Sequence, residues 1–315
     1  MRWFNTLISV IVLPLAYAAV PAMAAIPAHP GMLNYVEGQA RIDGRPVFNS
    51  NVGTADVREG QVIETGTGKA EMLLTPGVFL RLGDNSAVRL DAAGLTNTRV
   101  ALLRGHAMIE ADNLQKGNNI SVLDDGAVSR IEKNGIYSFT ANPREVATYD
   151  GKLAVTANDK TVELGKGHET NPQGLLTSAK FDVKANKSDP LYQWSSVRSQ
   201  YVAEANVDVA SNLGWNQSAW MGAGWYWDPW FAMYSWIPGD GMFWSPFGYG
   251  WGFYSPFTVW QSPIIVRRGF VGGRGFAGAY RAPAFRGGAV GMGRIGGGGM
   301  GRIGGGGMGH FGGRR

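Results

Sequence analysis

The chain has 315 residues, of which 44% are hydrophobic and 17% are charged, and its net charge is +5. This length allows two domains, or one domain with long appendages. Glycine, at 47 residues, has about twice its usual share, so part of the chain is not an ordinary packed domain. The absence of cysteine excludes disulfides, thiolate metal sites and thiol catalysis.

The first 24 residues have the pattern of a secretory signal peptide. Arg2 precedes an apolar run over Leu7–Val20, and Ala22-Met23-Ala24 offers the small residues at which a signal peptidase cuts. An uncleaved membrane anchor needs about 20 uninterrupted apolar residues, whereas Pro14 and Pro21 break this run. We therefore expect export, with cleavage after Ala24, and no helical membrane span in the mature protein.

The next segment, residues 25–187, is predicted to be an all-β domain. Its dominant period is two, as where Val78, Leu80 and Leu82 share one face and Phe79 and Arg81 share the other. Such alternation between clusters of Gly, Asn and Asp is typical of half-buried strands joined by tight turns. No helical period of any length occurs between Met32 and about Phe181.

The β domain also contains internal repeats. Tyr35–Ile42, Leu103–Ile109 and Tyr149–Val155 each place one glycine before an alternating strand, and Val57–Thr65 has a looser echo in Val162–Thr170. Repeated strand–Gly–strand units indicate a solenoid-like stack of short strands and hairpins, in which each unit buries its apolar face against its neighbours. The alternative is an irregular β-sandwich whose units are alike by accident.

The string VREGQVIETGTGKAEMLLTPGVFLRLGDNSAVRL over Val57–Leu90 resembles the central signature of the FecR-domain family. The matching positions are Gly60, Ile63, Thr65, Gly66, Gly77, Leu80, Leu82, Asn85 and Ser86. The resemblance, which continues to about residue 171, implies an extracytoplasmic all-β domain. In signalling members of that family, this domain receives a signal from an outer-membrane receptor and relays it to a sigma factor.

The resemblance is incomplete at the N-terminal side. Signalling members place a cytoplasmic sigma-binding region and a transmembrane helix before the β domain, whereas here we find only the predicted export signal. The resemblance therefore implies a binding and display role for the β domain, but it assigns that role to no particular residue. A sigma-factor regulatory role remains an alternative.

Residues 188–213 are predicted to form an amphipathic helix. Ser188-Asp189-Pro190 supplies an N-cap residue followed by proline in the first turn. The residues that then recur on one helical face are Leu191, Trp194, Val197, Tyr201 and Ala205. We expect this face to cover an exposed strand at the end of the β domain.

Residues 214–261 form an aromatic segment without a clear period, and we expect it to belong to a disordered C-terminal region. Between positions 215 and 260 lie 18 of the 36 aromatic residues, among frequent Gly and Pro. The side chains could pack on one another or on the β domain, contact the envelope or a membrane peripherally, or stack on glycans. The candidate contact residues are Trp225, Trp227, Trp230, Trp236, Trp244 and Trp251.

The tail, residues 262–315, is rich in Gly and Arg, and we expect it to be disordered. Nine arginines and no acidic residue follow Asp240, and the octapeptide MGRIGGGG occurs twice in succession from Met292. The candidate contacts here are Arg267, Arg268 and Arg274. Such Arg-Gly spacing is similar to that of nucleic-acid-binding tails. Because export removes the protein from nucleic acid, two alternatives remain: the arginines bind an anionic envelope polymer, or the tail is a flexible segment without a dedicated ligand.

We find no catalytic motif, and His29, His106, His168 and His310 lie too far apart to show metal-ligand spacing. His106 shares its strand face with Met108, so we expect it to face solvent. The sequence thus predicts a non-enzymatic protein without cofactor or metal, periplasmic or secreted, that binds an envelope protein or an anionic or glycan polymer. The alternative is a surface or matrix adhesion protein that acts through its C-terminal region. The ligand, the oligomeric state and the final compartment stay open.

Overall fold

The computed structural model describes residues 28–215, 222–238 and 242–252. The chain divides into two units at Phe270, and every described residue precedes that point. The predicted signal peptide over 1–24 and the Gly/Arg tail over 262–315 therefore lie outside the described residues. So do parts of the aromatic segment.

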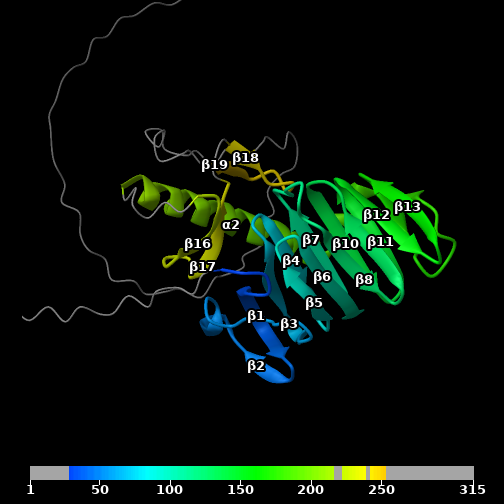
Figure 1. The fold of residues 1–315 in the computed structure, drawn as a ribbon, viewed down its shortest axis with the longest axis horizontal. Coiled ribbons are helices and arrows are strands. Elements are labelled where there is room, and N and C mark those ends of the chain that lie inside the picture. Colours follow the sequence, from blue (N-terminus) through cyan, green and yellow to red (C-terminus); the bar gives the residue numbers. More distant parts are fainter. Residues whose placement is uncertain (1–27, 216–221, 239–241, 253–315) are drawn as a thin grey trace, which may run out of the picture. The chain divides into compact units, whose positions relative to one another are not determined.

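Fifteen strands form one sheet, followed by a long helix and two small hairpins (Figure 1). The strands of the sheet are β1 (Leu33–Ile42), β2 (Arg45–Val47), β3 (Val62–Thr75), β4 (Val78–Leu82), β5 (Ala87–Gly94), β6 (Asn97–Arg104), β7 (His106–Ala111), β8 (Ile120–Asp124), β9 (Ala127–Ile131), β10 (Gly135–Ala141), β11 (Arg144–Asp150), β12 (Lys152–Ala157), β13 (Lys160–Gly165), β14 (His168–Thr170) and β15 (Ala179–Lys180). The other elements are η1 (Asn49–Asn51), α1 (Val183–Asn186), α2 (Pro190–Trp215), β16 (Gly224–Asp228), β17 (Met233–Ile237), β18 (Met242–Trp244) and β19 (Gly250–Gly252). This confirms the predicted all-β class with one long helix.

The sheet has two wings that meet at β3. The first wing runs β5-β6-β8-β9-β12-β13, and the second runs β4-β7-β10-β11-β14-β15. The N-terminal end of β3 pairs with β5 and its C-terminal end pairs with β4. After β3 the chain visits the wings in turn, one or two strands at a time. This is the winding of stacked strands and hairpins that the repeats predict.

The apolar core lies between the two wings. One cluster joins Leu80, Ile109 and Phe139 of the second wing to Val100 and Leu153 of the first. Because side chains alternate along a strand, each strand of the second wing turns its other side chains to the outer face of the sheet. Burial of the 29 residues of this cluster removes apolar surface from water and stabilises the packing of the two wings.

Glycine marks two of the places where the chain changes wings. Gly105 (φ +79°) separates β6 from β7, and Gly151 (φ +93°) separates β11 from β12. A Cβ atom on Gly105 would lie 2.3 Å from Ser86 Oγ, and one on Gly151 would lie 2.2 Å from Tyr137 Oη. Both positions need a left-handed backbone and have no room for a side chain. The glycine in two of the three sequence repeats therefore has a common structural cause.

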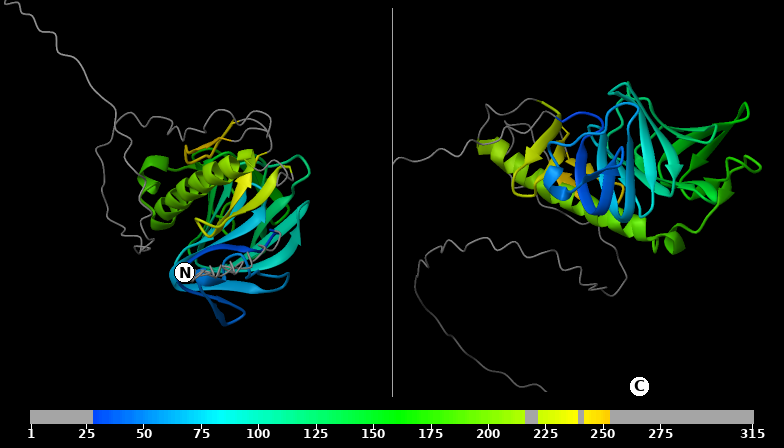
Figure 2. Two further views of the ribbon diagram at one scale, coloured as in Figure 1. Left: turned by 90° about the vertical axis from the view of Figure 1, so that its left-hand side faces the viewer. Right: turned by 90° about the horizontal axis from the view of Figure 1, so that it is seen from below.

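Helix α2 packs along the outer face of the sheet (Figure 2), not over an exposed strand edge as predicted. It buries Leu191 and Ala205 of the predicted face, but Val197 is 50% exposed and Tyr201 is 39% exposed. The side chains that it buries instead are largely small or polar, namely Ser195, Arg198, Ser199, Val202, Asn206 and Ala210. The predicted face is wrong in part because the sheet surface beneath α2 carries buried charges.

The aromatic segment is more regular than predicted. Strand β16 pairs with β17, and β18 pairs with β19, each as an antiparallel hairpin. The proline and glycine residues that interrupt strands lie between them. Pro229 is in the turn of the first hairpin, and Gly248 (φ +92°) is in the loop of the second. The predicted disorder is therefore wrong for residues 222–238 and 242–252, because Gly and Pro there punctuate strands instead of abolishing them.

Candidate functional site

The β16–β17 hairpin is fixed to the β domain by polar and aromatic contacts. The Asn34 side-chain oxygen accepts from the Tyr234 N–H at 2.7 Å, and its amide donates to the Tyr234 carbonyl at 3.1 Å. The Asn206 amide of α2 donates to the Trp236 carbonyl at 2.6 Å. The Trp225 ring meets Phe79 edge-on at 5.0 Å. The hairpin is therefore an integral layer of the fold, between the sheet and solvent.

The tip of this hairpin displays one tryptophan. The buried Asp228 carboxylate accepts the backbone N–H groups of Trp230 at 2.8 Å and Phe231 at 3.2 Å, which closes the turn. Burial raises the pKa of Asp228, and the two backbone hydrogen bonds oppose that shift. Trp230 itself is 84% exposed. A buried, hydrogen-bonded carboxylate thus holds in place a large apolar side chain that water surrounds.

The other predicted contact tryptophans have different environments. Trp225 and Trp227 are half-buried, and the Trp227 ring packs against Gly53. Trp236 is fully buried and so makes no surface contact, because its side chain packs in a cluster with Phe79 of the sheet and Val202 of α2. Trp244 is 36% exposed. The side chain of Trp251, and Arg267, Arg268 and Arg274, lie outside the described residues.

Beneath the hairpins and α2 lies a network of buried charges. Arg81 of β4 donates from Nε to Glu71 of β3 at 2.8 Å and from Nη1 to Glu110 of β7 at 2.5 Å. All three side chains are fully buried. Three neighbouring strands therefore carry a carboxylate–guanidinium–carboxylate row on the outer face of the sheet.

The same network reaches both segments that cover it. Arg198 of α2 donates to Glu71 at 3.0 Å, and the Ser199 hydroxyl of α2 donates to Glu110 at 2.7 Å. The Ser245 hydroxyl, which follows β18, also donates to Glu110, at 2.5 Å. The two arginines and two glutamates balance in charge, so the network satisfies the requirement that buried ions be paired.

The protonation of the network follows from these contacts. Burial would raise the pKa of Glu71, but Arg198 and Arg81 outweigh it and lower that pKa from 4.5 to about 2. Burial, and next the charge of Glu110, raise the pKa of the neighbouring Asp112 well above its usual range. Glu71 is therefore ionised at neutral pH, and the structure favours the protonated form of Asp112.

The sequence contained a partial signal for this network. Arg81 was predicted to lie on the opposite face from Leu80 and Leu82, and it does. Glu71 and Glu110 have the same outward parity on their strands. Such charges usually mark a solvated face, so only the position of α2 shows that they are buried.

His106 is half-buried instead of facing solvent, because the N-terminus of α2 covers its strand face. Its Nε2 lies 2.7 Å from Ser138 Oγ, and its Nδ1 lies 3.7 Å from the Asp189 carboxylate. Burial lowers the pKa of His106, although Asp189 opposes the shift. The Asp189 carboxylate instead accepts the Tyr192 N–H at the start of α2, at 2.7 Å. These residues therefore lack the short histidine–carboxylate hydrogen bond of a hydrolase triad.

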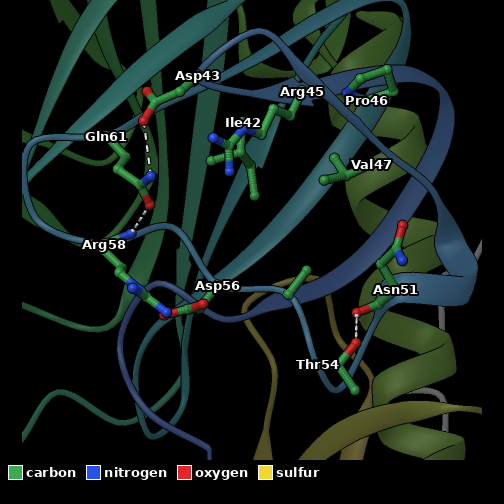
Figure 3. Close-up of a pocket in the computed structure, with 11 residues that line it drawn as sticks. Ile42, Asp43, Arg45, Pro46, Val47, Asn51, Thr54, Asp56, Arg58 and Gln61 are labelled. Carbon is green, nitrogen blue, oxygen red and sulfur yellow. Dashed lines mark hydrogen bonds and ion pairs between the residues drawn. The ribbon is translucent and has the colours of Figure 1, made fainter.

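A pocket of about 550 Å³ opens beside the β1–β2 hairpin (Figure 3). The residues that line it are Ile42, Asp43, Arg45, Pro46, Val47, Asn51, Thr54, Ala55, Asp56, Arg58 and Gln61. Its volume is in the range of small-molecule sites. Sequence analysis did not single out these residues, because they come from a hairpin and a loop without any motif.

The described ranges hold no group of three or more His, Asp or Glu side chains that could bind a metal ion. Their helices are too short or too polar to cross a membrane.

Comparison with known proteins identifies no family. No protein-family model matches the chain, and no curated protein sequence matches it. Two solved structures of a "putative anti-sigma factor" from Parabacteroides distasonis are similar. The one at 1.65 Å has TM-score 0.35 and 14% identity over 39% of this chain and 61% of its own length. The one at 2.50 Å has TM-score 0.36 and 12% identity over 57% of this chain and 99% of its own. The likeness is too low to carry an argument about function, so the FecR-domain resemblance stays a prediction.

Proposed function

We propose that this protein is an exported, non-enzymatic binding module of the bacterial cell envelope, periplasmic or secreted, with the β16–β17 tip as its contact surface. The observation that carries the proposal is the exposure of Trp230, at 84%, on a turn that the buried Asp228 closes. Exposed tryptophans on rigid supports are typical of binding surfaces, because little conformational entropy is lost when a partner covers them. The predicted signal peptide supports export.

The binding test compares two variants that remove exposed apolar side chains. The immobilised full-length protein should retain an envelope component, and Trp230→Ala should abolish that retention. Leu175→Ala is the control, because Leu175 is 80% exposed in a different part of the chain. Equal retention by both variants, or none by the wild type, would refute the proposed surface.

The export test is independent of binding. The N-terminal sequence of the protein recovered from envelope fractions or medium should begin at Ala25. Recovery of only the intact leader in the cytoplasm would contradict export.

An adhesion role of the C-terminal region needs a separate deletion. The hairpins over 222–238 and 242–252 pack onto the β domain, so a deletion that starts near residue 215 would uncover Phe79 and the buried charges. The deletion should therefore remove only residues 253–315. The proposed binding should survive it, whereas loss of binding would favour adhesion through the tail.

A further inference from the structure

The lining of the pocket beside the β1–β2 hairpin includes one arginine that has no polar partner among the described residues. The Asp43 carboxylate accepts the Gln61 amide at 2.8 Å and the Val62 N–H at 2.9 Å. Arg58 faces Asp56 at 3.4 Å. Arg45 is exposed and makes no hydrogen bond or ion pair with any described residue, and Figure 3 shows its side chain extending over Ile42.

The rest of the lining suits a ring that carries hydroxyl groups. Pro46 is exposed and supplies an apolar surface, next to the edges of Ile42 and Val47, whose side chains belong mainly to the core and are 8% exposed. Around them stand the amide of Asn51, the hydroxyl of Thr54 and the carboxylate of Asp56. A sugar ring presents apolar C–H groups on its face and hydroxyl groups at its edge, which matches this arrangement. A single free guanidinium adds a partner for one carboxylate.

We propose that this pocket binds an acidic saccharide of the uronic acid class, with its carboxylate on Arg45 and its ring on Pro46. This inference rests on the proposed function and names the chemical class of its ligand. A multiply charged phosphate group fits less well, because Asp43 and Asp56 lie in the same lining.

The pocket also lies beside the hairpin that carries Trp230. Its lining residues Asn51 and Thr54 lie on either side of Gly53, where an added Cβ atom would lie 2.8 Å from the Trp227 ring. Trp230 follows in the turn of the same hairpin. A chain of several sugars that leaves the pocket along the 51–54 loop therefore approaches an exposed aromatic ring, on which sugar faces stack. The ligand is accordingly an oligomer and not a single sugar.

The test titrates the full-length protein with three defined probes by calorimetry. They are a hexameric oligouronate, its carboxyl-reduced neutral counterpart and a hexa-aspartate of the same charge. Binding is expected for the oligouronate, with much weaker binding of the other two. Arg45→Gln should weaken oligouronate binding about tenfold or more, since a charge-assisted contact is lost.

Arg99→Gln is the matched control, because Arg99 is also exposed and its loss changes the net charge equally. It should leave oligouronate binding unchanged. The inference is overturned if the oligouronate does not bind, if hexa-aspartate binds equally well, or if Arg45→Gln and Arg99→Gln behave alike. Capture of an envelope component that depends on Trp230 would in those cases still support the proposed function, so the two failures are distinguishable.

Discussion

Arg81 is the residue on which the buried network depends, since it pairs with both Glu71 and Glu110. We predict that Arg81→Met lowers the free energy of unfolding by about 3–5 kcal/mol, because two carboxylates lose a buried partner. Urea denaturation measures the change. Arg89→Met is the control, as Arg89 pairs with Asp91 at the surface and its side chain is 44% exposed. Equal losses in both variants would show that the buried network contributes no more to the free energy of unfolding than a surface ion pair does.

Glu71 should make the protein sensitive to acid. Its pKa is about 2 in the folded protein against 4.5 ordinarily, so its stabilising effect is complete above pH 4.5 and is lost as the pH falls towards 2. The loss across that window should be about 3 kcal/mol. Urea midpoints between pH 5 and pH 2 measure it. Glu71→Gln should be less stable than the wild type at pH 7 but should lose less stability between pH 5 and pH 2. An equal loss of stability in both proteins would show that Glu71 is not the cause of the acid sensitivity.

At the level of elements, the crossings between wings depend on glycine. Gly105→Ala should destabilise the protein by about 3 kcal/mol or more, since it adds a left-handed strain and a clash with Ser86. Gly126→Ala is the control: Gly126 has φ +85° but open space around it, so strain alone should cost about 1–2 kcal/mol. Thermal or urea unfolding compares the two. Equal costs would mean that the close approach to Ser86 relaxes freely.

The elements also differ in how far the sequence predicts them. Strand alternation around Leu80 and the cap at Asp189 are local features, and both the strands and the helix were found. The buried face of α2 was predicted only in part, because Val197 and Tyr201 are exposed while Arg198 is buried. Helical periodicity locates an apolar stripe, but it does not show that the partner surface is charged.

For the described part of the molecule as a whole, the network predicts one cooperative unfolding transition. Arg198 of α2 and Ser245 of the second hairpin both bond to carboxylates of the β domain. Nine of the eleven tryptophans lie between residues 215 and 260, so fluorescence reports mainly on that segment. Fluorescence and far-ultraviolet circular dichroism should therefore give the same urea midpoint. An earlier fluorescence midpoint would show that the hairpins unfold separately.

The candidate functional site was also predicted only in part from the sequence. Sequence analysis selected the aromatic segment, and it named Trp230 and Trp236 alike. In the structure Trp230 is exposed and Trp236 is buried, since Trp230 lies in a turn and Trp236 lies on a strand whose side chains pack against α2 and the sheet. The pocket around Arg45 had no sequence signal, because its residues carry no motif and meet only through the hairpin and loop.

By itself the amino-acid order determined the β class, the winding repeat and the helix, because alternation, turn chemistry and capping act between residues close in the chain. Only the tertiary structure decided which outward-facing charges are buried. Arg198 meets Glu71 across 127 residues, and Ser245 meets Glu110 across 135. No local pattern reports such a pairing, because it exists only once α2 and the hairpins have excluded water from the outer face of the sheet.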